Sequence, residues 1–205
     1  MGSNCTIYHN CSIGEAPQDL KYAGEKTKVI IGNNVIIRES VTINRGTIAY
    51  GKTEIGSNVL LMACAHVAHD CIIGNHTIMA NLATLGGHVE LGEYVNLGGG
   101  VLVHQFGKIG SHSFVGGGYR VVKDVPPFII VAGEPLRFGG INKIGLQRRG
   151  YSYENRSLIK KAYRLFFISK MNRSDALNKI KSELPATDEI NSIIQFIESS
   201  ERGII

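Results

Sequence analysis

The stretch IGSNVLLMACAHVAHDCIIGNHTIMANLATLGGHVELGEYVNLGG, residues 55–99, decides the fold of this chain of 205 residues. Within it every sixth residue is aliphatic, and the same phase continues on both sides of the stretch. An α-helix needs a period near 3.6 residues and a flat strand a period of 2, so neither explains the pattern. With 43% hydrophobic residues overall, sixteen successive matches exclude chance. These positions are Ile31, Ile37, Ile43, Ala49, Ile55, Leu61, Val67, Ile73, Met79, Leu85, Leu91, Leu97, Val103, Ile109, Val115 and Val121.

Glycine adds a longer period to this pattern. It follows the aliphatic position at Gly32, Gly56, Gly74, Gly92 and Gly110, so that three intervals are eighteen residues and one is twenty-four. A unit of six residues with a super-period of eighteen corresponds to three short strands per turn of a coil. The sequence therefore predicts a hexapeptide-repeat parallel β-helix, a three-sided prism of stacked coils.

A second set of residues lies four positions after the aliphatic ones from Ile31 to Leu97 and is small or β-branched, and the pattern loosens at Gly107, Ser113 and Tyr119. A narrow prism interior requires such side chains, so we expect both sets to face inward. No histidine falls in either set, which predicts that the histidines point outward. The second set is Val35, Val41, Thr47, Thr53, Val59, Ala65, Cys71, Thr77, Ala83, Val89, Val95 and Val101.

The pattern ends near Val125-Pro126-Pro127, which predicts a β-helix over residues 1–132 and a helical C-terminal domain over 133–205. Phe128 to Ala132 is expected to be a last strand. Helical apolar spacing then predicts three helices, from about residue 157 to 166, around 176–180 with Asn172 or Ser174 as N-cap, and around 190–197. Residues 15–28 and 45–52 interrupt the coil, and loops that leave a rigid scaffold often carry chemistry.

Charge and composition restrict the class of protein. The net charge is +5, and residues 143–170 hold eight Lys or Arg but a single acid, Glu154. This basic stretch indicates either a solvated helical face or a surface for an acidic carrier protein, a membrane surface or a nucleotide phosphate. The absence of nucleic-acid motifs, of a signal peptide and of a long apolar run predicts no nucleic-acid partner and no integral membrane segment. The four cysteines lack CxxC spacing, which is typical of reduced thiols in a cytoplasmic protein.

Several polar residues in outward phases fall within forty residues of one another. One coil turn is eighteen residues, so residues that far apart stack about 4.8 Å apart on neighbouring coils. This places His69, Gly87 and Gln105 in one ladder and Asp70 under His88. So dense a cluster indicates a functional site on the outside of the prism. Its members are His66, His69, Asp70, His88, His104 and Gln105.

These residues belong to longer motifs that resemble the UDP-N-acetylglucosamine O-acyltransferases, which perform the first step of lipid A synthesis. The resemblance implies a homotrimer of left-handed β-helices, each with a helical C-terminal domain. It implies the transfer of a 3-hydroxyacyl group from acyl carrier protein to the sugar 3-hydroxyl of UDP-N-acetylglucosamine, with no cofactor or metal. The motifs are GEAPQDLKYAGE (14–25), IRESVTINRGT (37–47), LLMACAHVAHDC (60–71), ATLGGHVELGE (83–93), VLVHQFGKIG (101–110) and GLQRRG (145–150).

The resemblance also implies residue roles. His69 matches the general base, Asp70 the carboxylate that orients it, and the Gly87 N–H the oxyanion donor. Gly117 matches a position that limits the length of the acyl chain. The positions that match substrate contacts are Gln18, Asp19 and Lys21 on the first loop, His66, His88, His104 and Gln105 along the cleft, Asn44, and, for the nucleotide, Asn142, Arg148 and Arg149.

The sequence departs from the family pattern in three places. Asn44 stands where some members carry histidine, and Ile144 where some carry glutamate. Members usually have about three further coils before the point that matches the start of this chain. Alternatives to the O-acyltransferase are an N-acyltransferase acting on an amino-sugar nucleotide, a zinc hydratase with His66, His69 and His88 as ligands, and a scaffold without catalysis.

Overall fold

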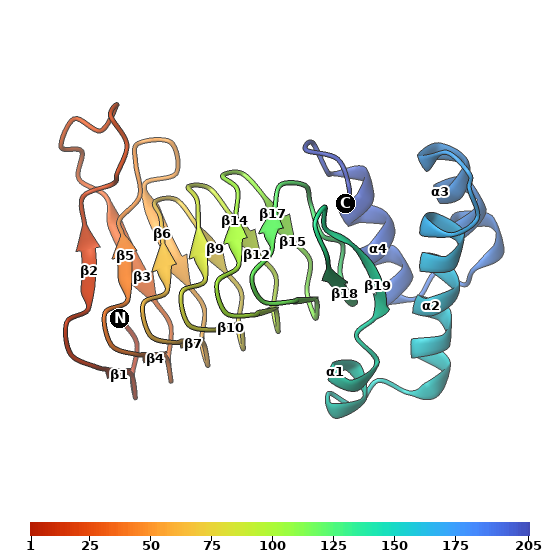
Figure 1. Ribbon diagram of the computed structural model, residues 1–205, viewed down its shortest axis with the longest axis horizontal. Helices are drawn as coiled ribbons and strands as arrows, with labels where there is room; N and C mark the ends of the chain where they lie inside the picture. Colours follow the sequence, from red (N-terminus) through yellow and green to blue (C-terminus); the bar gives the residue numbers. More distant parts are fainter.

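The computed structural model describes residues 1–205 as a three-sided prism with a helical region at one end (Figure 1). Each side of the prism is a sheet of short strands, and the parallel strands of one sheet come from successive coils. Sheet A contains β1 (Thr6–Ile7), β4 (Ile36–Ile37), β7 (Leu60–Leu61), β10 (Ile78–Met79), β13 (Asn96–Leu97), β16 (Phe114–Val115), β18 (Ile129–Ala132) and β19 (Arg137–Ile141). Sheet B contains β2 (Ser12–Glu15), β5 (Thr42–Asn44), β8 (His66–Val67), β11 (Thr84–Leu85), β14 (Leu102–Val103) and β17 (Arg120–Val121). Sheet C contains β3 (Lys28–Ile31), β6 (Lys52–Ile55), β9 (Ile72–Ile73), β12 (Glu90–Leu91) and β15 (Lys108–Ile109).

The strand register explains where the two loops leave the prism. Later coils pair residues eighteen apart, as in Thr84 with Leu102. Thr42 pairs with His66, twenty-four apart, and Ser12 pairs with Thr42, thirty apart. The additional six and twelve residues form the second loop (45–51) and the first loop (16–27), each between a strand of sheet B and a strand of sheet C. Both loops therefore leave at the corner between sheets B and C, the corner that also carries His69 and Asp70.

The prism interior is filled by the two predicted inward sets. All residues of the second set are buried, and all of the aliphatic set except Ala49. Ala49 was wrongly placed, because it lies in the second loop and is exposed. Buried polar groups in proteins are nearly always hydrogen-bonded, and the inward Thr77 follows this rule. Its hydroxyl donates to the Gly92 carbonyl at 3.1 Å.

The C-terminal part contains four helices, of which the first was not expected. Each begins at a residue whose side chain accepts a hydrogen bond from the backbone N–H three residues later: Asn142, Ser152, Asn172 and Thr187. None of the four combines the length and apolar character needed to cross a membrane. The helices are α1 (Lys143–Arg148), α2 (Tyr153–Phe167), α3 (Arg173–Glu183) and α4 (Asp188–Glu198).

The helical region is joined firmly to the prism. β19 pairs antiparallel with β18, so strand pairing continues beyond the expected division at residue 132, as far as Ile141. The buried Tyr163 of α2 donates its hydroxyl to the Pro127 carbonyl at 2.6 Å. After α4 the chain returns to the prism, where Ile204 bridges to Asp124.

Candidate active site

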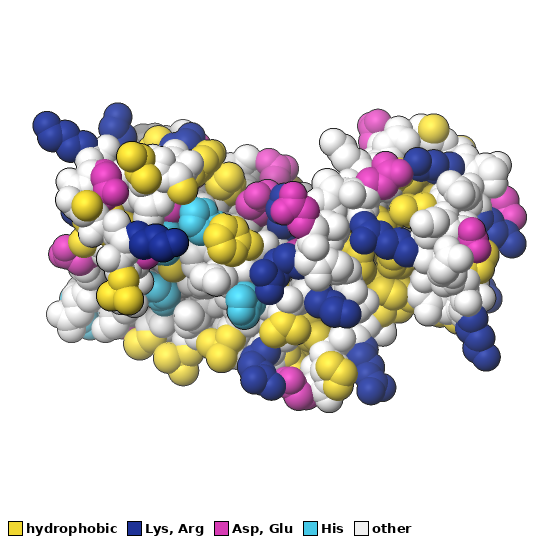
Figure 2. Space-filling view, turned by 90° about the horizontal axis from the view of Figure 1, so that it is seen from above, with side chains coloured by type: hydrophobic (Ala, Val, Ile, Leu, Met, Phe, Trp, Pro, Cys, Tyr) yellow, Lys and Arg dark blue, Asp and Glu magenta, His cyan; other side chains and the backbone are white.

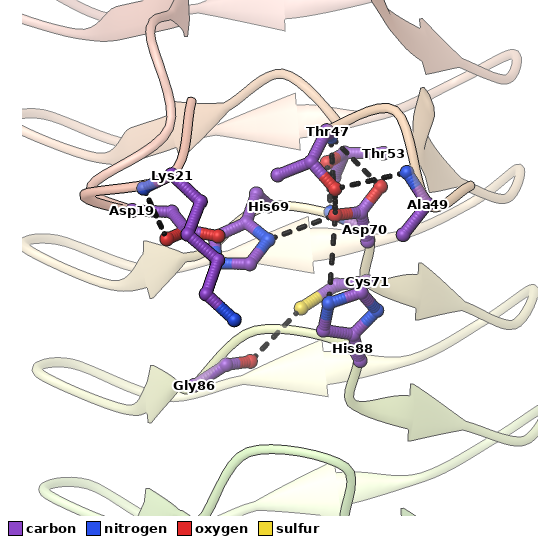
Figure 3. A network of polar contacts seen from close by, with 10 residues as sticks. All are labelled: Asp19, Lys21, Thr47, Ala49, Thr53, His69, Asp70, Cys71, Gly86 and His88. Carbon is purple, nitrogen blue, oxygen red and sulfur yellow. Dashed lines mark hydrogen bonds and ion pairs between the residues drawn. The ribbon is translucent and has the colours of Figure 1, made fainter. Parts of the chain in front are cut away.

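The centre of the site is a hydrogen-bonded pair at the corner between sheets B and C. His69 Nδ1 lies 2.8 Å from Asp70 Oδ2, as the network in Figure 3 shows. Asp70 sits in an outward phase, yet its side chain has no exposed surface, because the second loop covers it. The Thr47 backbone N–H and hydroxyl donate to the carboxylate at 2.9 and 2.7 Å, and the Asp70 N–H donates to Thr53 Oγ1 at 2.9 Å. The histidine is therefore held by a carboxylate that is itself fixed on every side.

The electrostatics of Asp70 keep it ionised. Burial would raise the pKa of this carboxyl, but the hydrogen bonds from Thr47 and His69 outweigh burial and lower the pKa below its ordinary value. A carboxylate accepts hydrogen bonds only, so the ring proton of neutral His69 resides on Nδ1. This leaves the lone pair on His69 Nε2, which points away from Asp70 and is available as a base.

Gly87 lies directly above the imidazole on the next coil. A Cβ atom built at this position would lie 2.7 Å from His69 Nε2 and 2.6 Å from the neighbouring ring carbon. Only glycine therefore fits here without displacing the ring. The Gly87 N–H takes no part in the hydrogen bonds of the coil, whereas its carbonyl accepts from Phe106 N–H at 2.9 Å. The stacking of His69, Gly87 and Gln105 on successive coils is confirmed.

The other histidines of the cluster surround this pair. His88 packs edge-on against His69, with ring centroids 5.1 Å apart, and its Nε2 lies 3.7 Å from Asp70 Oδ2. The partner of His66 Nδ1 is the Thr42 hydroxyl at 2.7 Å, and burial lowers the pKa of His66. His104 and Gln105 are exposed one coil farther along.

The first loop approaches the same corner. In Figure 3 Asp19 and Lys21 are drawn on the His69 side of the network, and the Lys21 N–H donates to Asp19 Oδ1 at 2.9 Å. Gln18 is exposed on the same loop. Asn44 differs from these residues, since it is buried and its Nδ2 donates to the Ala16 carbonyl at 2.9 Å. In this chain Asn44 therefore holds the start of the first loop and does not face open space.

The expected nucleotide residues form a second cluster at a different corner, between sheets C and A. The Arg149 guanidinium lies 4.8 Å from the ring centroid of Tyr94, and its Nη1 is buried without a partner. Asn142 caps α1 and donates from Nδ2 to the His112 carbonyl at 2.9 Å, while Arg148 is exposed beside it. One chain therefore does not bring these residues to His69, because sheet C lies between the two corners.

Gly117 lies at the third corner, between sheets A and B, and is exposed. A Cβ atom here would meet the Gly99 carbonyl oxygen of the preceding coil at 3.0 Å. Any side chain at this position would therefore press on the neighbouring coil before it extended outward.

One group of side chains could hold a metal ion. The donor atoms of His69, Asp70 and His88 lie within 4.8 Å of one another. This set contains Asp70 in place of His66, the third histidine of the zinc hydratase alternative, and His66 Nδ1 contacts the Thr42 hydroxyl. Asp70 Oδ2 already accepts hydrogen bonds from Thr47 and contacts His69, so a metal would have to displace these contacts.

Three residues near the site were not identified from the sequence. Thr47 belongs to the second inward set and so resembled a core residue. Arg45 adjoins it at the start of the second loop, and its contacts are described below. Arg202 lies in the C-terminal tail, where its Nη2 is 3.2 Å from His104 Nδ1. The twenty-four-residue glycine interval was the one sequence signal that pointed to the second loop.

The second cluster generates a prediction about stability. Burial, and next the charge of Arg149, lower the pKa of His112 from 6.5 to about 4. Between these values the unfolded chain binds more protons than the folded chain, so the free energy of unfolding should fall as the pH is lowered from 6.5 towards 4. Denaturant unfolding across this range should show a smaller fall for His112→Phe, which keeps a ring between Tyr94 and Phe128. An unchanged pH dependence in the variant would contradict this assignment.

Comparison with known proteins places the chain in a family. The profile described as "Udp N-acetylglucosamine O-acyltransferase; Domain 2" matches residues 124–205, and "Bacterial transferase hexapeptide (six repeats)" matches residues 52–87. Over 205 residues the chain is 48% identical to an acyl-[acyl-carrier-protein]–UDP-N-acetylglucosamine O-acyltransferase of Thermodesulfovibrio yellowstonii, covering all of this chain and 80% of the relative. The corresponding protein of Nautilia profundicola is 47% identical over 207 residues, covering all of this chain and 79% of the relative.

Solved structures agree. A UDP-N-acetylglucosamine acyltransferase from Bacteroides fragilis superposes with a TM-score of 0.90 at 47% identity, covering 100% of this chain and 80% of that one. The Francisella novicida UDP-N-acetylglucosamine acyltransferase gives a TM-score of 0.95 at 36% identity, with 98% and 75% covered. The chain therefore belongs to the UDP-N-acetylglucosamine O-acyltransferase family, whose left-handed hexapeptide-repeat β-helix and helical C-terminal region it shares.

Proposed function

We propose that the chain transfers a 3-hydroxyacyl group from acyl carrier protein to the 3-hydroxyl of UDP-N-acetylglucosamine at the His69 corner. The observation that carries this proposal is the stack of Asp70, His69 and Gly87. A hydroxyl is a poor nucleophile at neutral pH, so the reaction needs a base beside it. The stack offers a base with a free Nε2 and, directly above it, a backbone N–H that the coil does not use.

In the proposed reaction, His69 Nε2 removes the proton of the sugar hydroxyl as the oxygen attacks the thioester carbonyl carbon. The carbonyl oxygen becomes an oxyanion and accepts a hydrogen bond from the Gly87 N–H, an interaction typically worth about 3–4 kcal/mol. The C–S bond then breaks, and His69 returns the proton to the departing thiolate. Asp70 orients the ring throughout and stabilises the imidazolium while it exists.

A prediction about activity concerns the pair of His69 and Asp70. His69→Ala should lower kcat by about 10²–10⁴-fold, because the attacking oxygen loses its base. Asp70→Asn should cost less, about 10–100-fold, since it removes only orientation and charge. Both are checked with radiolabelled acyl donor and thermal unfolding, and the His69→Ala chain should stay folded because this side chain supports no core. Activity of His69→Ala within tenfold of wild type would remove His69 from the mechanism.

We further propose that the working enzyme is a homotrimer with the site shared between subunits. The charged nucleotide residues Arg148 and Arg149 lie at one corner and His69 at another. Sheet C separates the two corners within one chain, and its outward Glu54 and Glu90 are paired with Lys52 and Lys108 at 2.7 and 3.4 Å. A neighbouring copy can supply the second corner instead. Sheet A offers an apolar outer face for association, formed by Ile36, Leu60, Ile78 and Phe114.

Mixing two inactive variants tests the shared site. His69→Ala keeps the nucleotide arginines, and the double variant Arg148→Ala/Arg149→Ala keeps the base. If each site takes one residue group from each of two neighbours in a ring of three, random mixing should restore about a quarter of the wild-type activity. Light scattering must show trimers for each variant. No recovery after unfolding and refolding the mixture would instead place both groups in one subunit's site.

We propose that the basic end of the molecule binds acyl carrier protein. Figure 2 shows Lys and Arg side chains gathered where the prism meets the helical region. A cavity of about 900 Å³ there is lined by Lys143, Arg156, Lys160 and Arg164 together with apolar residues such as Phe138. Lys161 lines a neighbouring hollow. Basic side chains around apolar surface suit an acidic protein partner that also buries apolar side chains.

Charge reversal tests this surface. Lys160→Glu/Lys161→Glu should raise KM for acyl carrier protein and leave KM for the sugar nucleotide unchanged. The matched control is Arg173→Glu/Lys179→Glu on α3, which lines neither hollow and should leave both KM values unchanged. Wild-type activity should also fall with salt, because exposed charges are screened beyond about 8–10 Å. Equal effects of the two double variants would mean that net charge, not this surface, matters.

The acyl chain is proposed to run from His69 across the outer face of sheet B towards Gly117. Leu102 is exposed on that face and offers apolar contact. The exposed Gly99 and Gly117 leave the far corner without side chains. Each methylene buried along this path contributes about 0.8 kcal/mol, so bulk at Gly117 favours shorter donors.

A further inference from the structure

We infer that Arg45 is a positioning residue for the acceptor substrate, because it fastens the first loop to the same short segment that holds the catalytic carboxylate. This inference rests on the proposed function, in which Asp19 and Lys21 on that loop contact the sugar nucleotide. It adds a residue that touches neither substrate nor base.

All three nitrogens of the Arg45 guanidinium are engaged by the first loop and the strand before it. Nε and Nη2 donate to the Tyr22 hydroxyl at 2.9 and 2.7 Å, and Nη1 donates to the Gly14 carbonyl at 2.9 Å. The Tyr22 hydroxyl in turn donates to the Glu25 carbonyl at 2.9 Å. Each nitrogen therefore donates one hydrogen bond that holds the first loop or the strand before it.

Few other contacts of this kind hold the loop. Asn44 and Arg45 link residues 16–27 to the prism by side-chain hydrogen bonds, through Ala16 and Tyr22, and the adjacent Glu15 accepts from the Ala16 N–H. The remaining hydrogen bonds of the loop are internal, such as those from Lys21 and Tyr22 N–H to Asp19. Removing the hydrogen bonds of the Arg45 guanidinium should therefore free the part of the loop that carries Asp19 and Lys21.

The segment that fastens the loop is also the one that buries Asp70. Two residues after Arg45, Thr47 donates its N–H and hydroxyl to the Asp70 carboxylate. Residues 44–47 thus form hydrogen bonds to the first loop on one side and to Asp70, the partner of His69, on the other. Loop and base share one rigid support, which sets the position of the acceptor relative to His69.

The test uses the whole chain with Arg45→Lys, which keeps the charge but lacks the planar fork, and Tyr22→Phe, which keeps the ring but removes the shared hydroxyl. The matched control is Arg38→Lys. Arg38 also lies against a tyrosine ring, 4.4 Å from the Tyr8 centroid, and pairs with Glu39, but at another corner. Steady-state kinetics with UDP-N-acetylglucosamine and acyl donor are combined with hydrogen exchange of residues 16–27.

Both variants should raise KM for the sugar nucleotide about five- to tenfold, with little change in kcat or in KM for the acyl donor. In both variants the amides of residues 16–27 should exchange faster than in wild type, and the amides of the coils should exchange at the wild-type rate. The Arg38→Lys protein should show wild-type exchange throughout. Lys21→Ala should cost little in an Arg45→Lys background, since the two changes disable one element.

The inference would be overturned by unchanged exchange in the loop, or by faster exchange with an unchanged KM for the sugar nucleotide. Additive effects of Lys21→Ala and Arg45→Lys would do the same. The exchange measurement needs no substrate. If wild type fails to acylate UDP-N-acetylglucosamine, the proposed function is lost, and loop exchange still decides whether Arg45 holds the loop.

Discussion

The parallel pairing of one coil with the next is the constraint on which the rest of this structure depends. Backbone hydrogen bonds such as Ile72 N–H to the Val89 carbonyl, at 2.9 Å, repeat around all three sheets and hold each residue above the one eighteen positions earlier. Because the inward positions must stay inward, a coil accommodates additional residues only by expelling them at a corner. The two insertions of this chain, six and twelve residues long, are expelled at the same corner.

That stacking places the proposed catalytic groups and also limits which residues can stand beside them. A glycine at 87 is needed because the coil spacing leaves no room for a Cβ atom above His69. A carboxylate beneath the histidine would be costly if buried without partners. The second loop removes this difficulty by supplying the Thr47 N–H and hydroxyl. The second loop thus holds the carboxylate that orients His69, and the Arg45 guanidinium at the start of this loop also holds the first loop.

The same geometry places the proposed site residues at different corners of the prism. A prism has three corners, and in this chain His69 lies at one, Arg148 and Arg149 at a second, and the glycines proposed to line the acyl path at the third. If the sugar nucleotide contacts both His69 and the two arginines, as we propose, a second copy of the prism supplies the corner that one copy cannot. The aromatic stack of Tyr94, His112 and Phe128 packs along the corner that carries Arg149, with ring centroids 5.0 and 5.5 Å apart.

The sequence by itself determined the coil period, the two inward sets and the ladder of His69, Gly87 and Gln105, because a strict six-residue repeat converts position in the chain directly into position on the prism. It also determined the family, through long ordered motifs. Only the tertiary structure decided that Asp70 is buried, that Asn44 and Arg45 support the first loop, that Ala49 leaves the core and that β19 extends sheet A. These features depend on loops and on an antiparallel return, where the repeat is interrupted. There the position of a side chain is set by contacts with segments distant in sequence, and no period records such contacts.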